Sequence, residues 1–161
     1  MEPLPHPDPW HTWLAASARR FLLFARDQTR SEADARDVLQ EALVESWRRH
    51  GDAPPPDALV FATIRRRAID LARRDQRRAR RELVSPDWFS GGPETPGEDA
   101  ELERAVKDLP PNLREVVVLK TWSALTFQEI ATTLGVPLNT AASRYRYAIE
   151  RLRESLKELR P

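Results

Sequence analysis

The stretch "LTFQEIATTLGVPLNTAASRYRYAIERLR", Leu125 to Arg153, has the punctuation of two helices that meet at a glycine–proline corner. Thr126 followed by Glu129 predicts a capping box, in which a hydroxyl and a carboxylate satisfy free backbone amides at a helix start. Gly135 is expected to end that helix, because glycine readily takes the backbone conformation that closes a helix. The pattern therefore predicts a pair of short-linked helices.

The second helix of this pair is expected to follow Pro137, with Asn139 or Thr140 as its cap. One side of it is apolar at helical spacing, through Ala141, Tyr145, Ala148, Ile149, Leu152 and Leu156. The opposite side carries Asn139, Ser143, Arg146 and Glu150, flanked by Thr140, Arg144, Tyr147 and Arg151. Short polar groups and arginines on an exposed helix suit base edges and phosphates in a DNA major groove. The pair is therefore interpreted as a helix-turn-helix, with a solvated helix hairpin as the alternative.

The composition favours a soluble, all-α protein. Of the 161 residues, 40% are hydrophobic and 32% are charged, and only five are glycine. This length makes one ordinary domain or two small helical domains that share little core. Cysteine is absent and the three histidines stand apart from carboxylates, so we expect no metal site, no cofactor and no catalytic residue.

Nothing in the sequence predicts export or membrane insertion. No apolar run approaches the roughly 20 residues of a membrane span. The first ten residues, "MEPLPHPDPW", lack the basic and apolar regions of a signal peptide. A cytoplasmic location is expected.

Charge is zoned along the chain. Residues 27–45 hold six acids and two bases, and residues 82–108 hold eight acids and two bases. Residues 64–81 hold nine arginines and two aspartates, and residues 140–161 hold six bases and three acids. Two basic blocks separated by acidic stretches predict two contacts with a polyanion and at least one with another partner.

Three amphipathic helices are expected in the first half of the chain. The first follows the prolines before Trp10, the second lies between Ser31 and Gly51, and the third runs from about Asp57 to Arg81. The residues expected to face inward are Trp13, Leu14, Phe21, Leu22 and Phe24 in the first helix, Leu39, Ala42, Leu43, Ser46 and Trp47 in the second, and Leu59, Phe61, Ile64, Ala68, Ile69 and Leu71 in the third. A separate stripe on the second helix is formed by Asp37, Gln40, Glu41 and Val44.

The segment "LVSPDWFSGGPETPGEDAE" has three prolines, three glycines and little periodicity, which indicates a linker. From Glu101 onward the pattern predicts three or four more helices, including the pair described above.

Two motifs resemble one protein family. "LPPNLREVVVLKTWSALTFQEIATTLGVPLNTAASRYRYAIERLR" resembles region four, the carboxyl-terminal DNA-binding region of bacterial sigma factors of the extracytoplasmic-function class. "DARDVLQEALVESW" resembles region two of that class, and "RRRAIDLARR" resembles the basic helix that follows it. The resemblance covers roughly residues 13 to 159 apart from the linker. It implies two small helical domains, region two at 10–82 and region four at 101–161, joined by a flexible linker at 83–100.

The resemblance implies a promoter-specificity subunit that binds core RNA polymerase and promoter DNA and opens the duplex. Region two would contact and open the downstream promoter element, and region four would read the upstream element. By the resemblance, Asp37, Gln40 and Glu41 would contact the polymerase. DNA contact falls to Arg65, Arg66, Arg73 and Arg74 in region two and to Asn139, Thr140, Ser143, Arg144, Arg146 and Tyr147 in region four. An inhibitory anti-sigma factor is a further candidate partner that the sequence does not identify.

The chain departs from the family pattern at positions that affect DNA contact. Ala142 stands where lysine or arginine is common before "SR", and Tyr147 stands where arginine often precedes the alanine. Arg66 stands where asparagine is frequent, so a charge replaces an amide among the contacts that open the strands. Base preference therefore does not carry over from the family.

Other function classes explain less of the sequence. A helix-turn-helix regulator acting without polymerase would leave the acidic stripe and the linker unexplained. A protein-binding module derived from a sigma factor would keep the packing and lose DNA affinity. An enzyme is least expected, because no carboxylate pair, activated nucleophile or phosphate-cradling glycine loop is present, and no small-molecule substrate is predicted.

Overall fold

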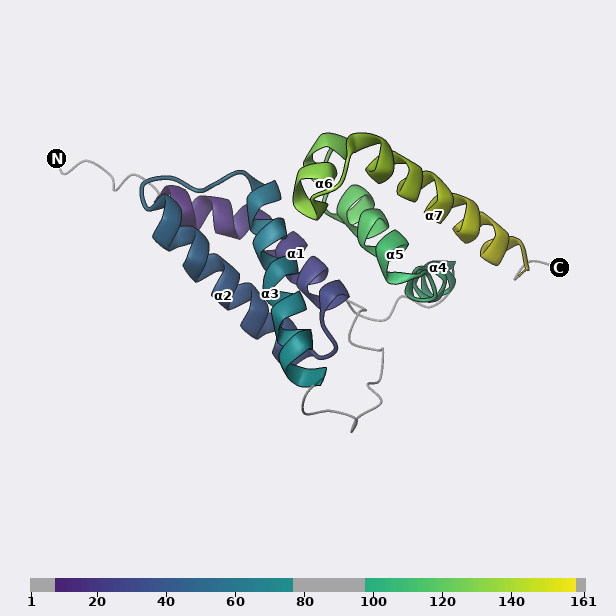
Figure 1. The fold of residues 1–161 in the computed structure, drawn as a ribbon, viewed down its shortest axis with the longest axis horizontal. Coiled ribbons are helices and arrows are strands. Elements are labelled where there is room, and N and C mark those ends of the chain that lie inside the picture. The colour runs from purple at the N-terminus through teal and green to yellow at the C-terminus, as the bar shows by residue number, and fades with distance from the viewer. Residues whose placement is uncertain (1–7, 77–97, 159–161) are drawn as a thin grey trace.

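The computed structural model describes residues 8–76 and 98–158, and these residues form helices joined by short turns (Figure 1). The first domain consists of α1 (Pro9–Gln28), α2 (Glu32–His50) and α3 (Asp57–Gln76). The second consists of α4 (Glu98–Lys107), α5 (Pro111–Val117), the π-helical turn η2 (Val118–Trp122), α6 (Phe127–Leu134) and α7 (Leu138–Glu158). The expected all-α class with two helical domains is confirmed. The predicted linker lies outside the described residues up to position 97, and its last three residues belong to α4.

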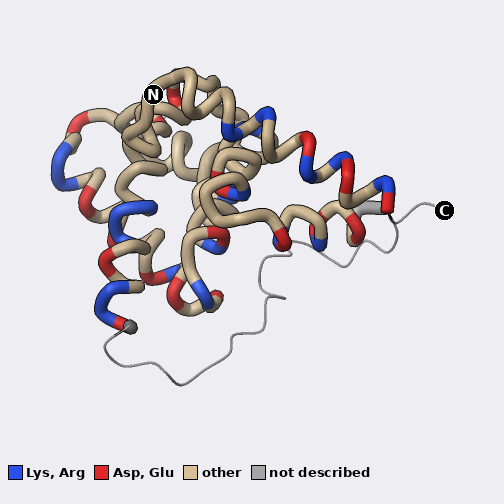
Figure 2. The backbone as a smooth tube through the Cα atoms, turned by 45° about the vertical axis from the view of Figure 1, so that its right-hand side comes forward, with Lys and Arg blue, Asp and Glu red and all other residues tan. Residues whose placement is uncertain are grey.

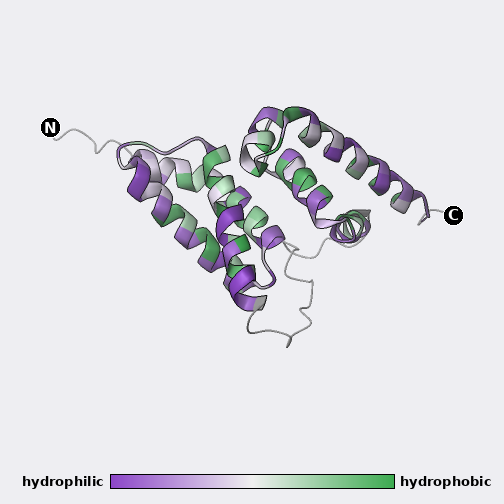
Figure 3. Cartoon of the chain, viewed as in Figure 1, coloured by the Kyte–Doolittle hydropathy of each residue, from purple (hydrophilic) through white to green (hydrophobic). Residues whose placement is uncertain are grey.

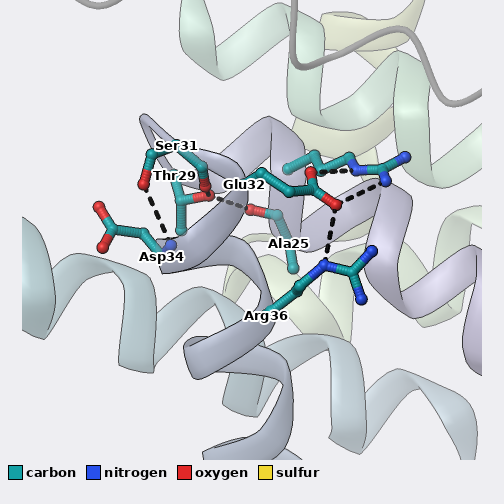
Figure 4. A network of polar contacts seen from close by, with 7 residues as sticks. Ala25, Thr29, Ser31, Glu32, Asp34 and Arg36 are labelled. Carbon is teal, nitrogen blue, oxygen red and sulfur yellow. Dashed lines mark hydrogen bonds and ion pairs between the residues drawn. The ribbon is translucent and has the colours of Figure 1, made fainter.

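Side chains define the corner between α1 and α2. The hydroxyl of Ser31 accepts a 3.1 Å hydrogen bond from the backbone N–H of Asp34, which caps the start of α2. Glu32 accepts bidentate hydrogen bonds of 2.7 Å from Arg26 at the end of α1, and also pairs with Arg36 one turn along α2 (Figure 4). Hydrogen bonding from Arg26 holds the pKa of Glu32 below its ordinary value.

Aromatic rings fill the core of the first domain. The ring of Phe61 on α3 packs edge-on against Phe21 and Phe24 of α1, with centroid distances of 4.9 and 5.5 Å. The expected inward positions Ile64 and Ala68 are also buried. Apolar and polar stripes run along the same helices in Figure 3, as amphipathic packing requires.

Three residues expected to face inward are instead exposed: Trp47, Leu59 and Ile69. On α2, Ser46 takes the inward position at the end of the helix, and its hydroxyl donates to the carbonyl of Ala42. On α3, Val60 is fully buried, so Leu59, about 100° away around the helix, points outward. The predicted inward positions Ser46 and Ala68 are confirmed, and their neighbours Trp47 and Ile69 were wrongly included. On α3 the prediction named Leu59 in place of Val60.

The second domain packs α7 against α4, α5 and α6. The predicted apolar side of α7 is confirmed, since Ala141, Ala148 and Leu152 are buried and Tyr145, Ile149 and Leu156 pack against the same core. None of the helices between residues 8 and 76 or between 98 and 158 has the length and apolar character to cross a membrane.

The two domains are packed against each other. Helix α6 lies against α3, and η2 and α5 lie against α1 (Figure 1). The hydroxyl of Thr133 on α6 donates a buried 3.2 Å hydrogen bond to the carbonyl of Ala58 on α3. Buried apolar residues of both domains form one cluster. The expectation that two domains would share little core is therefore not met.

Candidate nucleic-acid and polymerase interfaces

The corner of the helix-turn-helix is built as the sequence predicts. The backbone N–H of Glu129 donates to the hydroxyl of Thr126 at 3.1 Å, and the N–H of Thr126 donates to the Glu129 carboxylate at 3.0 Å. Gly135 ends α6 with a φ of 65°, a left-handed conformation that glycine adopts without strain. The capping box and the glycine stop are both confirmed.

The predicted cap of α7 is wrong. The helix begins at Leu138, and the carbonyl of Pro137 accepts the first bonds, from the N–H groups of Thr140 at 3.0 Å and Ala141 at 3.1 Å. Asn139 and Thr140 therefore lie inside the first turn. Pro137 can precede a helix directly because it has no N–H group to satisfy. This start leaves the side chain of Asn139 exposed.

Packing between α6 and α7 fixes the orientation of α7. The rings of Phe127 and Tyr145 meet edge-on with centroids 5.4 Å apart. The ammonium group of Lys120 lies 4.6 Å from the centroid of the Phe127 ring and 3.4 Å from the carbonyl of Leu125. These contacts connect the turn before α6 to α7. They fix which side of α7 packs against the domain and which side faces outward.

The structure brings the predicted DNA-contacting residues together on the first three turns of α7. Asn139, Arg146 and Tyr147 are exposed, and Thr140, Ser143 and Arg144 are half-buried. The guanidinium carbon of Arg146 lies 5.6 Å from the centroid of the Tyr147 ring, within the range of a cation–π contact. Figure 2 shows charged residues of both signs farther along α7, so its positive groups are not confined to one end.

The acidic stripe lies on the outer face of α2. Asp37, Gln40, Glu41 and Val44 are all exposed. Glu41 pairs with Arg67, with 3.6 Å between Nη1 and Oε2, a weak pair at this exposure. Val44 also lines an apolar groove of about 350 Å³ with Trp10, Trp13 and Trp47, between the start of α1 and the end of α2. The polar stripe and this groove are adjacent parts of one surface.

The four predicted arginines of α3 differ in their surroundings. Arg73 and Arg74 are exposed, and no ion pair is found for either within the described residues. Arg66 is half-exposed, and its Nη2 lies 2.6 Å from Oε1 of Glu45 on α2. Arg65 is bound to Glu115 of α5, with Nε 3.0 Å from Oε2 and Nη2 3.3 Å from Oε1.

Sequence reasoning missed these carboxylate partners. It also missed Arg67, whose Nε donates to Oε2 of Glu45 at 3.3 Å, so that Glu45 binds both Arg66 and Arg67. Burial opposes the charge of Glu45, but the charge of Arg66 and hydrogen bonds from both arginines hold the pKa of this carboxyl below its ordinary value. Glu45 is therefore a charged, well-held acceptor between α2 and α3. A cleft of about 140 Å³ opens beside it, lined in part by His50, Thr63 and Arg66.

Comparison with known proteins identifies the family. The family model Sigma-70 region 2 matches residues 8–78, and Sigma-70, region 4, matches residues 99–152. The ECF RNA polymerase sigma factor SigL of Mycobacterium tuberculosis is 36% identical over 149 residues, covering 84% of this chain and 82% of that protein. The chain belongs to the ECF family of RNA polymerase sigma factors.

Other sigma factors align over both domains. The RNA polymerase sigma-E factor of Streptomyces coelicolor is 32% identical over 140 residues, covering 82% of this chain and 77% of that protein. The sigma factor RpoE of Bartonella quintana, solved in complex with the anti-sigma factor NepR, has a TM-score of 0.74 at 21% identity, covering 91% of this chain and 96% of that chain. CnrH, solved with the cytosolic domain of CnrY, has a TM-score of 0.67 at 22% identity, covering 92% and 88%. These two structures show the same fold.

In this ECF sigma factor, region two thus comprises α1, α2 and α3, and region four comprises the helices from α4 to α7. The family resemblance predicted from the sequence is confirmed. The acidic stripe and the arginines of α3 belong to region two, and the exposed face of α7 belongs to region four.

Proposed function

We propose that this sigma factor binds core RNA polymerase and directs it to promoters, with region four reading the upstream element and region two contacting and opening the downstream element. The observation that carries this function is the presence of both sigma regions, in order, on one chain. We assign residues 10–82 to region two, 83–100 to the linker and 101–161 to region four.

The polymerase contact is assigned to Asp37, Gln40 and Glu41. All three are exposed on one face of α2, and Asp37 makes no ion pair in the described residues. A basic surface on the polymerase would complement this face, since complementary charge raises the rate of association and fixes the register of docking. The neighbouring Val44 supports the contact with apolar area that is not buried within the chain.

Reading of the upstream element is assigned to α7. In helix-turn-helix proteins the second helix enters the major groove and its first turns reach base edges. Ser143 and Arg146 lie on the side opposite the apolar core, so they would contact bases. Thr140 and Arg144 lie on the flank and would contact phosphates, while Asn139 and Tyr147 extend the surface at either end.

Contact with the downstream element is assigned to α3. Arg73 and Arg74 are exposed and available for phosphates, and Arg65 and Arg66 lie about two turns earlier on the same helix. The cleft beside His50 and Arg66 opens at the start of the loop between α2 and α3, where an unstacked base would lie once the strands separate.

The remaining assignments follow from the family. The chain acts as an initiation factor in the cytoplasm and not as an enzyme, and takes no small-molecule substrate. An anti-sigma factor is proposed as a partner, since the sigma factor RpoE of Bartonella quintana was solved in complex with one.

A binding experiment separates this function from that of a helix-turn-helix regulator acting alone. The full chain is mixed with core polymerase and labelled promoter fragments, and the species are resolved by gel filtration. A sigma factor is expected to co-elute with the core enzyme and to bind promoter DNA in that complex. Binding of duplex DNA by the chain alone, without co-elution with the core enzyme, would favour the regulator.

A further inference from the structure

One arginine of the promoter-contacting helix is occupied by a carboxylate from the other domain. Arg65 on α3 binds both oxygens of Glu115 on α5, at 3.0 and 3.3 Å. This side-by-side pairing is the geometry in which arginine also binds phosphate. The side chain of Glu115 is only 8% exposed, so solvent does not compete for it.

The surrounding contacts hold Glu115 in place. Gln28 at the end of α1 donates to Oε2 of Glu115 at 3.1 Å, and also to Asp27 at 2.9 Å. Asp27 in turn accepts a 2.8 Å bond from Arg114, the neighbour of Glu115 on α5. Glu115 is thus held directly by Gln28 and Arg65 of region two. Its helix is held in turn by the pair between Arg114 and Asp27.

More contacts join the same two regions away from this network. Arg20 on α1 donates a 2.7 Å hydrogen bond to the carbonyl of Ser123, just after η2, and the same guanidinium pairs with Asp57 at the start of α3. Thr133 bonds to Ala58 at the start of α3. These contacts keep Glu115 beside Arg65 while the two regions stay packed. The side chain of Arg65 is itself 30% exposed, so a DNA phosphate and the Glu115 carboxylate compete for the same guanidinium.

We propose that Glu115 is an internal substitute for a DNA phosphate, which occupies Arg65 and so makes the packed arrangement of regions two and four an autoinhibited form of the free sigma factor. The inference rests on the proposed DNA contact of α3. Separation of the regions transfers Arg65 from the carboxylate to the promoter. The free chain therefore binds DNA with one basic contact fewer than the sequence of α3 provides.

The test compares DNA binding by the full-length chain and its Glu115→Gln variant without polymerase. Fluorescence anisotropy with a labelled 20-base-pair duplex, repeated over a range of potassium chloride concentrations, gives the affinity and its salt dependence. Each added phosphate contact steepens the slope of log K against log salt by about 0.9. Glu115→Gln is expected to bind several-fold more tightly at low salt, with a slope steeper by about one unit.

Glu32→Gln is the matched control. It also removes one carboxylate that binds an arginine bidentately, but Glu32 lies at the α1–α2 corner (Figure 4). Its partner Arg26 is 15% exposed. The charge change is the same in both variants, so a gain confined to Glu115→Gln assigns it to release of Arg65. Adding Arg65→Gln to Glu115→Gln should abolish the gain.

Arg65→Gln in the otherwise unchanged chain gives a second, independent readout. It should weaken transcription by the polymerase complex, because the promoter then loses the contact with Arg65. Equal affinity of the wild-type chain and folded Glu115→Gln, including no binding by either, would overturn the proposal, and so would a gain that persists in the double variant Glu115→Gln, Arg65→Gln. Transcription by the wild-type complex in the same experiment shows separately whether the proposed function holds.

Discussion

The Nε atom of Arg114 in region four lies 2.8 Å from Oδ1 of Asp27 in region two, and the side chain of Asp27 is 1% exposed. Arg114 also donates to the carbonyl of Lys107 at 3.1 Å, so its guanidinium is held at both ends. A buried carboxylate with one arginine partner depends on that partner, because an uncompensated charge in an apolar interior is costly. The contact between the two regions is therefore expected to be sensitive to this pair.

Replacing Arg114 by methionine should destabilise the folded chain by about 3 to 5 kcal/mol, since it leaves the buried carboxylate of Asp27 without a cation. Urea unfolding at pH 7, followed by circular dichroism, measures the change. Arg36→Met is the control, because Arg36 is 65% exposed and its pair with Glu32 is worth less than about 1 kcal/mol. Adding Asp27→Asn to Arg114→Met should recover part of the loss. Equal effects of the Arg114 and Arg36 substitutions would contradict this role for the pair.

Stability should also depend on the protonation of Asp27. Burial raises the pKa of Asp27 from 3.8 to about 6, although the charge and hydrogen bond of Arg114 act in the opposite direction. The folded chain therefore holds this proton more tightly than the unfolded chain does. The stabilisation from Asp27 is fully present below pH 3.8 and is lost as the pH rises to about 6.

Asp27→Asn removes this titration. The free energy of unfolding of the wild-type chain, minus that of Asp27→Asn, should fall by about 3 kcal/mol as the pH rises from about 4 to about 7, at 1.36 kcal/mol for each unit of pKa shift. Urea unfolding of both chains across this range gives the difference at each pH. A difference that stays constant would show that Asp27 titrates at an ordinary pKa.

The helical fold and much of region four could be predicted from local sequence, because caps and apolar periodicity act within a few residues. Thr126, Glu129 and Gly135 set the ends of α6 as expected, and the buried stripe of α7 follows its spacing. The partners of Asp27 and Glu115 could not be predicted. A charged residue on an amphipathic helix gives the same sequence pattern whether it faces water or an arginine 50 or more positions away.

The errors at Trp47 and Leu59 have a related cause. Large apolar residues are expected to face the core, but on these helices Ser46 and Val60 occupy the inward positions. A shift of one residue rotates a side chain by about 100°. Apolar spacing alone does not show which of two adjacent residues faces the core when both positions fit the stripe. Packing against the facing helix determines which of the two is buried.

Reversing charge on the acidic stripe should prevent docking on core polymerase. The double variant Asp37→Lys and Glu41→Lys places two cations opposite a basic surface, which costs several kcal/mol of binding energy. The fold should persist, because both side chains are exposed and, among residues 8–76 and 98–158, Glu41 makes one weak ion pair. Co-elution with core polymerase measures the effect. Glu154→Lys with Glu158→Lys, on exposed positions of α7, makes the same charge change as a control, and undiminished co-elution of the stripe variant would contradict the assignment.

Two arginines of α7 should have separable roles. Arg146→Ala removes a base contact and should change which upstream elements are used, with a loss of about 1 to 3 kcal/mol at the preferred base. Arg144→Ala removes a phosphate contact and should lower activity at every promoter by a similar factor. Transcription by the polymerase complex from a set of promoter variants measures both. If Arg144→Ala reorders the promoters and Arg146→Ala does not, the two roles are reversed.

The most direct test of the whole account is transcription from a library of promoter sequences by purified core polymerase, with and without the chain, followed by sequencing of the transcripts. The account predicts start sites that appear only when the chain is present, downstream of two sequence elements at a fixed spacing, one read by region four and one opened by region two. Transcripts that are the same with the core enzyme alone would contradict it.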